Sequence, residues 1–258
     1  MGIHLQKDDL LPLQKMEMKA KTYAQWIISP TASGMYQMAK EMNIDSVPEK
    51  CHVVPHAVNV VLESRESARS RLGLSEDDVL LLAVGRLDPM KRFSLLVEAV
   101  SLIPAEKRPR IIVLGEGSEK DKLLALAKER GVHNNFEIRV TDTIGTYLSA
   151  ADMYISVSST ESFGLANCEA VLAGIPSICT NVGAVPELLQ DAVIFVDDDK
   201  YMIADRIQQL LASDKQRTKL REQTKIISKK WPGAEEIAKK LEDIYLCCNA
   251  DQENRWQD

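Results

Sequence analysis

The chain has 258 residues and 45% hydrophobic content, which is enough for one large domain or two modest ones with a buried core. Its 32 Lys and Arg against 38 Asp and Glu give a net charge of -6. This balance argues against a general nucleic-acid binder, because nothing offsets phosphate repulsion over a broad surface. The five cysteines form no CxxC pair and no even framework, so we expect reduced thiols, a cytoplasmic protein and no cysteine-bound metal.

Neither a membrane span nor a secretory signal is predicted. No run approaches the roughly 20 apolar residues that cross a bilayer, and the start lacks an apolar core followed by a small-residue cleavage site. The segment 215–230 is strongly basic, with a thin apolar stripe. We therefore predict a solvated helix face there, and peripheral membrane contact is the alternative.

The two ends of the chain carry elements that are too few for a core of their own. Residues 1–62 give a helical stretch, a strand at 25–29, a helix at 32–42 and an extended exit at Pro55. So few strands would leave exposed edges. We expect 1–62 to be terminal elements of a mostly absent N-terminal domain plus a linker, and 231–258 to be a crossover helix and tail whose apolar face needs a partner.

Short apolar runs alternate with helical patterns through residues 63–230. Continuous hydrophobicity within each run is typical of strands covered on both faces of a sheet. Helical spacing separates the runs, as in 93–103 and in 118–131, which ends on Gly131 in the manner of a C-cap. Repeated strand and helix units predict an α/β, Rossmann-like, doubly wound parallel sheet with right-handed crossovers. The runs lie at 79–84, 110–114, 135–140, 153–157, 176–180 and 192–196.

Ligands of an open parallel sheet bind at the carboxyl ends of its strands, and three loops of this chain lie there. The first, "GRLDPMKRF", begins at Gly85 and carries Arg86 and Lys91 five residues apart. Two cations beside the amides of the next helix predict a pyrophosphate site, because guanidinium gives bidentate contacts and ammonium a movable charge. The alternative is a surface turn with solvated charges.

The second loop, "LGEGSEK", follows the run at 110–114. Gly115 and Gly117 allow close backbone approach, and Ser118 is predicted to cap the next helix. The loop lacks the third glycine of the dinucleotide fingerprint, and no acidic residue ends the following strand, so NAD binding is disfavoured. The alternative is an ordinary turn between a strand and a helix.

The third loop, "TESFGLANCEAVLAGIP", places Phe163, Gly164 and Leu165 where a helix should begin. Free amides there are expected to hold phosphate or sugar oxygens. Glu161 and Glu169 lie eight positions apart and can face one molecule, accepting hydrogen bonds from hydroxyl pairs of a sugar and a ribose. The alternative is that Glu161 caps the helix and Glu169 lies on its wet face. Paired cations and paired carboxylates at one sheet edge together predict a nucleoside diphosphate that carries a sugar.

These motifs resemble a known family. "AVGRLDPMKRF", "LGEGSEKDKLLALAKERGV", "YLSAADMYISVSSTESFGLANCEAVLAGIPSICTNVGAVPEL" and "KKWPGAEEIAKKLEDIY" look like the C-terminal, donor-binding half of retaining GT-B glycosyltransferases of family 4, also called glycosyl transferases group 1. The resemblance covers roughly residues 25–248. Its E-x7-E element is specific in this context, whereas the glycine turns are not.

The resemblance implies a role for each site residue. Arg86 and Lys91 would neutralise the donor diphosphate and stabilise the leaving group. Glu161 would hold hydroxyls of the donor sugar and Glu169 the ribose. Anomeric configuration would be retained by same-face attack, with a phosphate oxygen receiving the acceptor proton and no protein nucleophile, metal or other cofactor. The implied catalytic residues are Arg86, Lys91 and Glu161, and the implied donor-binding residues are Gly85, Gly115, Gly117, Phe163, Gly164, Leu165 and Glu169.

The chain departs from the family pattern at several positions. The hinge reads "VPHAV", so His56 and Ala57 replace a polar residue and a glycine, and His56 is expected to pack in the hinge. Arg139 and Val140 lie where a glycine usually ends a strand, which bears on recognition of the base. The "DDD" at 197–199 is predicted to cap a helix rather than to bind a metal, and Cys168 is predicted to be a small buried side chain.

A complete GT-B enzyme also has an N-terminal domain that binds the acceptor, and the resemblance gives this chain only the final elements of that domain. We therefore expect a partner chain that carries the acceptor domain, or self-association. A non-catalytic nucleotide-sugar binding or structural subunit is an alternative function. A glycoside hydrolase with Glu161 and Glu169 as acid and nucleophile is a third, and it leaves Arg86 and Lys91 unexplained.

Overall fold

The structure is a computed structural model that describes residues 26–41, 47 and 50–255. Contacts divide the chain into two compact units: 58–231, and a second unit from the segments 1–57 and 232–258. The helical stretch that was predicted before residue 25 lies outside the described residues. The larger unit holds the three loops predicted to bind a ligand.

The larger unit is built on a six-stranded sheet in which all neighbouring strands are parallel, in the order β5-β4-β3-β6-β7-β8. All six predicted strands are present, so the predicted Rossmann-like α/β fold is confirmed. The strands are β3 (Leu80–Val84), β4 (Arg110–Leu114), β5 (Phe136–Arg139), β6 (Met153–Ser156), β7 (Ser177–Thr180) and β8 (Val193–Val196).

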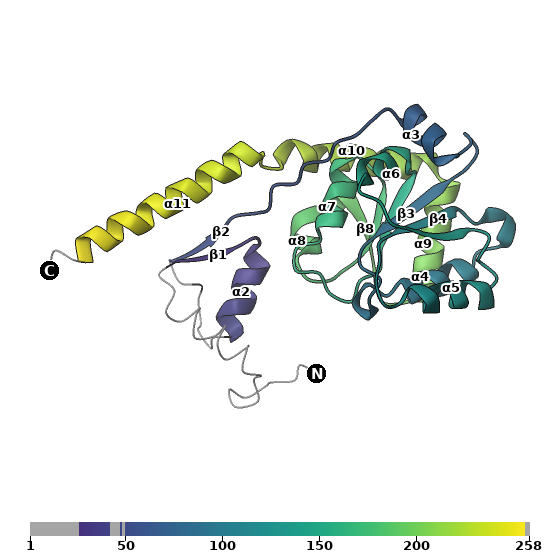
Figure 1. Ribbon diagram of the computed structural model, residues 1–258, viewed down its shortest axis with the longest axis horizontal. Coiled ribbons are helices and arrows are strands. Elements are labelled where there is room, and N and C mark those ends of the chain that lie inside the picture. The colour runs from purple at the N-terminus through teal and green to yellow at the C-terminus, as the bar shows by residue number, and fades with distance from the viewer. Residues whose placement is uncertain (1–25, 42–46, 48–49, 256–258) are drawn as a thin grey trace. The chain divides into compact units, whose positions relative to one another are not determined.

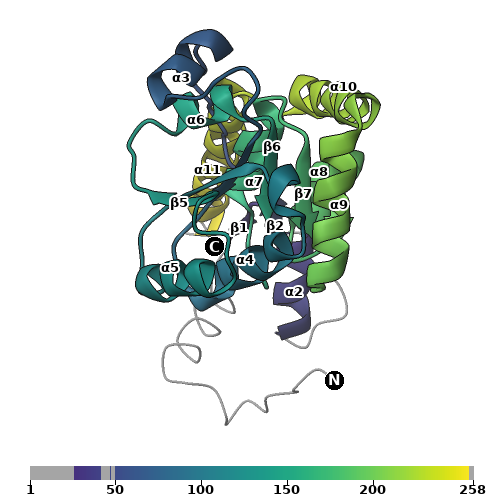
Figure 2. The ribbon, with the colours of Figure 1, turned by 90° about the vertical axis from the view of Figure 1, so that its right-hand side faces the viewer.

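Helices cover both faces of this sheet, which explains why the strands are apolar at successive positions. On β3, Leu81 and Ala83 belong to one core cluster with helices α4, α5 and α9, whereas Leu80 and Leu82 belong to a second cluster with α3, α6, α7 and α8. Figures 1 and 2 show α4 beside α5 on one side of the strands and α3 beside α6 on the other. These helices and α10 are α3 (Arg65–Leu72), α4 (Phe93–Ser101), α5 (Lys120–Glu129), α6 (Ile144–Ala150), α7 (Leu165–Leu172), α8 (Val185–Leu189), α9 (Lys200–Ala212) and α10 (Asp214–Lys230).

The smaller unit contains a two-stranded parallel sheet of β1 (Ile27–Ser29) and β2 (Cys51–Val53), with helices α2 (Ala32–Glu41) and α11 (Ala234–Arg255). Val54 of this unit packs with Ile237 and Ile244 of α11, so the predicted apolar face of the last helix has a partner. His56 and Ala57, the predicted hinge residues, line a groove of about 300 Å³ within this unit. Among the described residues, no helix combines the length and apolarity that a membrane span requires.

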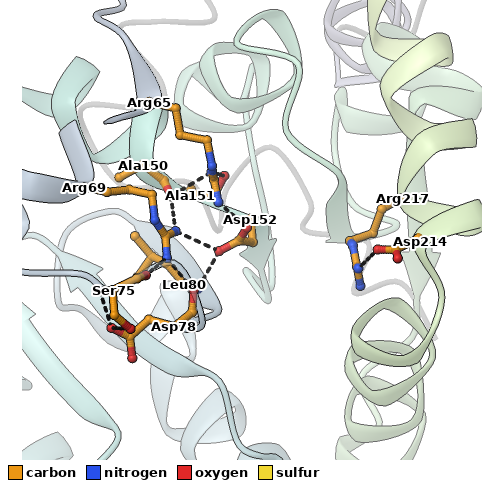
Figure 3. Close-up of polar contacts among 10 residues, drawn as sticks. All are labelled: Arg65, Arg69, Ser75, Asp78, Leu80, Ala150, Ala151, Asp152, Asp214 and Arg217. Carbon is orange, nitrogen blue, oxygen red and sulfur yellow. Dashed lines mark hydrogen bonds and ion pairs between the residues drawn. The ribbon is translucent and has the colours of Figure 1, made fainter. Parts of the chain in front are cut away.

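A buried arginine ties α3 to the amino ends of two strands (Figure 3). The Arg69 guanidinium donates hydrogen bonds to the carbonyl oxygens of Asp78 (2.6 Å) and Ala150 (3.2 Å) and to Asp152 Oδ2 (3.3 Å). Asp152 Oδ2 also accepts a hydrogen bond from the backbone amide of Leu80 at 2.8 Å. One side chain thereby joins the residues that precede β3 and β6.

We expect Arg69→Lys to lower the free energy of unfolding by about 3 kcal/mol, because an ammonium group cannot reach all these acceptors and leaves some buried without a partner. Urea melts followed by circular dichroism measure the change. Asp214→Asn is the control, because the Asp214 carboxylate that pairs with Arg217 in the same view is 92% exposed. Equal stability of Arg69→Lys and the wild type would contradict the role of Arg69.

Candidate functional site

The site lies where the order of the sheet reverses. After β3 the chain adds β4 and β5 on one side, and it then returns to place β6 on the other side of β3. The loops that leave β3 and β6 therefore diverge at their carboxyl ends, which is where open α/β sheets bind ligands. Arg86 and Lys91 are on the loop after β3, and Glu161 is on the loop after β6.

The loop after β3 folds into a short 3-10 turn, Pro89–Lys91. The Asp88 carboxylate caps this turn by accepting a hydrogen bond from the amide of Lys91 at 3.2 Å, and it pairs with Arg86 at 3.2 Å. The Lys91 stem passes close to Gly85, where an added Cβ would lie 3.2 Å from Lys91 Cε. Gly85 therefore leaves room for Lys91 to reach across the sheet edge. The Arg86 side chain on the same loop is 76% exposed.

Lys91 and Glu161 meet directly. Lys91 Nζ lies 2.5 Å from Glu161 Oε1, and the same oxygen accepts a hydrogen bond from Ser158 Oγ at 2.7 Å. Their side chains are only 21% and 11% exposed, respectively. The sequence predicted these charges at one sheet edge, and the structure brings this cation and this carboxylate into one ion pair.

The loops after β3 and β4 lie against each other at two glycines. An added Cβ at Gly115 would lie 1.9 Å from the carbonyl oxygen of Gly85, and one at Gly117 would lie 2.4 Å from that of Leu87. The amide of Leu87 donates to the Glu116 carbonyl at 2.8 Å. The close approach that these glycines allow in this structure is therefore between two loops of the chain.

The predicted cap at Ser118 is wrong. Helix α5 begins at Lys120 with Glu119 as its N-cap residue, and no side chain caps it. The amide of Glu119 donates to the carbonyl of Leu87 at 3.0 Å, which ties the start of α5 to the neighbouring loop. The predicted end of this helix is confirmed, because Gly131 adopts a left-handed φ of 66°.

The third loop leads into α7 as predicted. Gly164 is the N-cap residue, with a left-handed φ of 80°, and Leu165 opens the helix and is 48% exposed. Phe163 instead points into the core, where its ring meets that of Trp231 edge-on at 6.1 Å between centroids. Gly183 lies against the backbone of Glu161, where an added Cβ would lie 1.7 Å from the Glu161 carbonyl oxygen.

Glu169 lies in the second turn of α7. Unlike Glu161, it forms no ion pair with any of the described residues. Burial raises the pKa of its carboxyl group above the usual 4.5. In the part of the chain that the structure describes, its carboxylate has no hydrogen-bond or ion-pair partner. A half-buried carboxylate in this state is suited to accept hydrogen bonds from ligand hydroxyls.

Buried polar groups lie beside the two carboxylates. Burial raises the pKa of the Cys168 thiol to about 12, and the charges of Glu169 and Glu161 add to the shift. Cys168 is fully buried and protonated, as the sequence predicted. Tyr154 donates to Asn167 Oδ1 at 2.8 Å, and Asn167 Nδ2 is a buried donor for which the described residues supply no acceptor.

Sequence reasoning missed Ser158, Asn167 and Arg92, the residue after Lys91. No local pattern marks Asn167 or Arg92, because their partners lie on other strands and loops, and a serine three residues before Glu161 is too common a pattern to mark Ser158. The helix cap that was predicted within "DDD" is confirmed, since Asp199 caps α9 by accepting a hydrogen bond from the amide of Tyr201 at 2.7 Å. Among the described residues, no group of three or more His, Cys, Asp or Glu side chains is arranged to hold a metal ion.

Comparison with known proteins identifies the family. A profile described as glycosyl transferases group 1 matches residues 64–250. The chain is 31% identical over 216 residues to a D-inositol 3-phosphate glycosyltransferase of Xylanimonas cellulosilytica, covering 76% of this chain and 51% of that protein. It is 26% identical to the N-acetyl-alpha-D-glucosaminyl L-malate synthase of Bacillus anthracis, covering 72% of this chain and 50% of that protein. The chain belongs to the glycosyl transferases group 1 family, and it spans about half the length of these two curated relatives.

Solved structures share the fold. Sucrose-phosphate synthase from Thermosynechococcus elongatus matches with a TM-score of 0.83 and 21% identity, covering 96% of this chain and 65% of that one. Anabaena Alr3699/HepE, solved in complex with UDP and glucose, matches with a TM-score of 0.79 and 17% identity, covering 93% of this chain and 67% of that one. These neighbours are GT-B glycosyltransferases, so the fold predicted from the resemblance is confirmed.

We expect Glu169→Gln to raise the free energy of unfolding at pH values above the pKa that Glu169 has in the folded chain. At pH values below the usual pKa of a carboxyl group, the free energy of unfolding should stay unchanged. Burial raises the pKa in the folded chain, so the wild type loses stability as the pH rises through the folded value. Thermal melts at pH 4 and pH 8 measure the difference between variant and wild type. Glu129→Gln, at a position that is 67% exposed, is the control and should show no gain that grows with pH.

Proposed function

We propose that this chain is the donor-binding half of a retaining hexosyltransferase and binds a nucleoside-diphosphate sugar at the carboxyl edge of its sheet. The observation that carries the proposal is the Lys91–Glu161 pair at the β3/β6 switch point, together with Glu169 on the adjoining helix, which has no partner among the described residues. A cation and two carboxylates match the two chemical parts of such a ligand, an anionic diphosphate and hydroxyl-bearing rings.

Each group has a distinct role in this proposal. Lys91 and the exposed Arg86 neutralise the diphosphate and stabilise the charge that develops on it as the glycosidic bond breaks. Glu161 accepts hydrogen bonds from the sugar, and Glu169 accepts them from the ribose. The amides at the start of α7, which have no partner four residues earlier in the helix, contact sugar and phosphate oxygens. A phosphate oxygen receives the acceptor proton, and the product keeps the anomeric configuration of the donor.

UDP is the first nucleotide to test, because Alr3699/HepE is described in complex with UDP and glucose. In our proposal the acceptor is held by a domain other than the donor-binding unit 58–231. Light scattering of the purified protein tests whether the chain self-associates. Leu220 and Thr224 are the buried residues of α10, so its basic face points away from the protein, and we propose that this face is solvated; peripheral membrane contact through it is the alternative.

A nucleotide-sugar binding subunit without catalysis is the second candidate, because Lys91, Glu161 and Glu169 would all serve binding alone. The two candidates differ in turnover. Release of free nucleotide from a bound nucleotide sugar, once an acceptor domain is supplied, favours the transferase. Tight binding without any release favours the binding subunit.

Calorimetric titration with UDP, GDP, ADP and their glucose conjugates tests donor binding. We expect saturable binding of one nucleotide and its conjugate, and Glu169→Ala should weaken both by about tenfold through loss of the ribose contact. Lys225→Ala is the control, because this α10 lysine is 65% exposed. Absence of binding to all six compounds by the folded wild type would contradict the proposal.

A double-variant cycle tests the division of roles between Lys91 and Glu161. Lys91→Ala should weaken binding of the nucleoside diphosphate by at least about 30-fold, because the phosphates then face an uncompensated Glu161 carboxylate. Glu161→Gln should weaken binding of the sugar conjugate more than binding of the nucleoside diphosphate. Combining both changes should recover part of the diphosphate affinity, since the repelling charge is gone. Strictly additive losses in the calorimeter would show that the pair does not act as one unit.

A further inference from the structure

Arg92 joins three loops at the carboxyl edge of the sheet. It follows Lys91 directly, and its Nε and Nη2 donate hydrogen bonds to the carbonyl oxygens of Val157 (2.9 Å) and Ser158 (3.0 Å) on the loop after β6. Its Nη1 forms an ion pair with Asp198, between β8 and α9. One guanidinium thus connects segments that lie 65 to 106 positions away in the sequence.

The backbone of Arg92 adopts a conformation that favours glycine. Its φ is 49° and its ψ is 37°, which is the left-handed region. Among the described residues, Arg92 and Gln190 are the non-glycine residues with positive φ. A side chain at such a position is unfavourable unless its surroundings hold it there, and in this chain two carbonyl groups and a carboxylate do so.

The contacts of Arg92 lead to Glu161 in two steps. The Ser158 carbonyl oxygen is held from two sides, by Arg92 and by Thr180 Oγ1 at 2.7 Å. The Ser158 hydroxyl then donates to Glu161 Oε1, the oxygen that meets Lys91. Displacing the Ser158 backbone therefore moves the group that orients the Glu161 carboxylate.

Arg92 is not placed as a ligand for phosphate. Its side chain is 19% exposed, and its hydrogen-bond donors point to protein carbonyl groups and to Asp198. Arg86, by contrast, is 76% exposed and has one carboxylate partner, so it can turn toward an anion. The two arginines of this loop have separate tasks, one within the protein and one toward the ligand.

We infer that Arg92 is a positioning residue, which fixes the loop 157–161 so that Glu161 faces both Lys91 and the sugar of the bound nucleotide. This inference rests on the proposed function for its ligand, but its structural part does not. Arg92 would then help the site to discriminate between a nucleotide and its sugar conjugate, although Arg92 touches neither.

Two variants test this inference. Arg92→Lys keeps the positive charge and loses the fork that reaches two carbonyl groups, and Arg92→Gly removes the side chain while favouring the same backbone conformation. Hydrogen exchange measured by mass spectrometry reports on the loop 157–161. Calorimetry gives the Kd of UDP and of UDP-glucose, or of whichever nucleotide pair the wild type binds.

In both variants we expect amide exchange in the loop 157–161 to become about tenfold faster, since about one net hydrogen bond is lost. The Kd of the sugar conjugate should rise about tenfold, and that of the nucleotide less than about threefold. Arg108→Lys is the matched control, because Arg108, like Arg92, uses its guanidinium to hold backbone carbonyl groups, in its case those of Ser101, Ile103 and Gly131. It should lower the melting temperature without changing the ratio of the two Kd values.

Unchanged exchange in the loop 157–161, or equal weakening of nucleotide and conjugate, would overturn the inference. Equal weakening would give Arg92 a purely structural role, like that of Arg108. If the wild type binds no nucleotide, the proposed function fails, and the exchange experiment still decides whether Arg92 holds the loop. Failures of the two proposals are therefore distinguishable.

Discussion

The ion pair between Lys91 and Glu161 joins the two loops on which the site depends. These residues lie 70 positions apart in the sequence, and they meet because β3 and β6 are neighbours in a parallel sheet. Parallel strands bring their carboxyl ends to the same edge, so each loop delivers its charged group to one place. In this half-buried position, each charge makes the burial of the other acceptable.

Glycines make this meeting of loops sterically feasible. Gly85 leaves room for the Lys91 stem, Gly115 lets the loop after β4 lie against the carbonyl of Gly85, and Gly183 lies against the carbonyl of Glu161. A side chain at Gly115 or Gly183 would push one loop away from the next, and one at Gly85 would crowd the Lys91 stem. The loops after β3, β4, β6 and β7 are therefore packed together without a ligand. This packing fixes the positions of the charged groups that the loops carry.

Much of this fold could be predicted from the sequence, because a sheet covered on both faces requires continuous apolar runs. The runs at 79–84 and 153–157 became β3 and β6, and Asp199 caps α9 as its position suggested. The layer that each strand residue faces cannot be predicted from such runs, since Leu80 and Leu81 are equally apolar although they face opposite layers. The position of the charged residues on loops after parallel strands predicted one site, and the resemblance to a family then implied a role for each residue.

The rest of the site could not be predicted because it depends on contacts across the sheet edge. An arginine next to Lys91 can pair with any acceptor within its reach, and only the folded chain shows that it holds Val157 and Ser158. Ser118 illustrates the opposite failure. Its type and position favour a cap, but the helix begins at Lys120 and no side chain caps it. The carbonyl of Leu87 on a neighbouring loop accepts a hydrogen bond from the amide of Glu119 and fixes the backbone at this point. Local rules fail where a tertiary contact decides where a helix begins.

The two carboxylates of the site differ in a way that stability alone does not explain. Glu161 has a lysine and a hydroxyl as partners. Glu169 is half-buried, and burial raises the pKa of its carboxyl group with no compensating group in the part of the chain that the structure describes. A neutral side chain of the same shape would be better tolerated at position 169 in the free protein. Hydroxyl groups of a ligand would supply the missing hydrogen bonds and stabilise the ionised carboxylate. Binding of such a ligand should therefore strengthen as the pH rises through the pKa of Glu169, while the stability of the free protein declines over the same range.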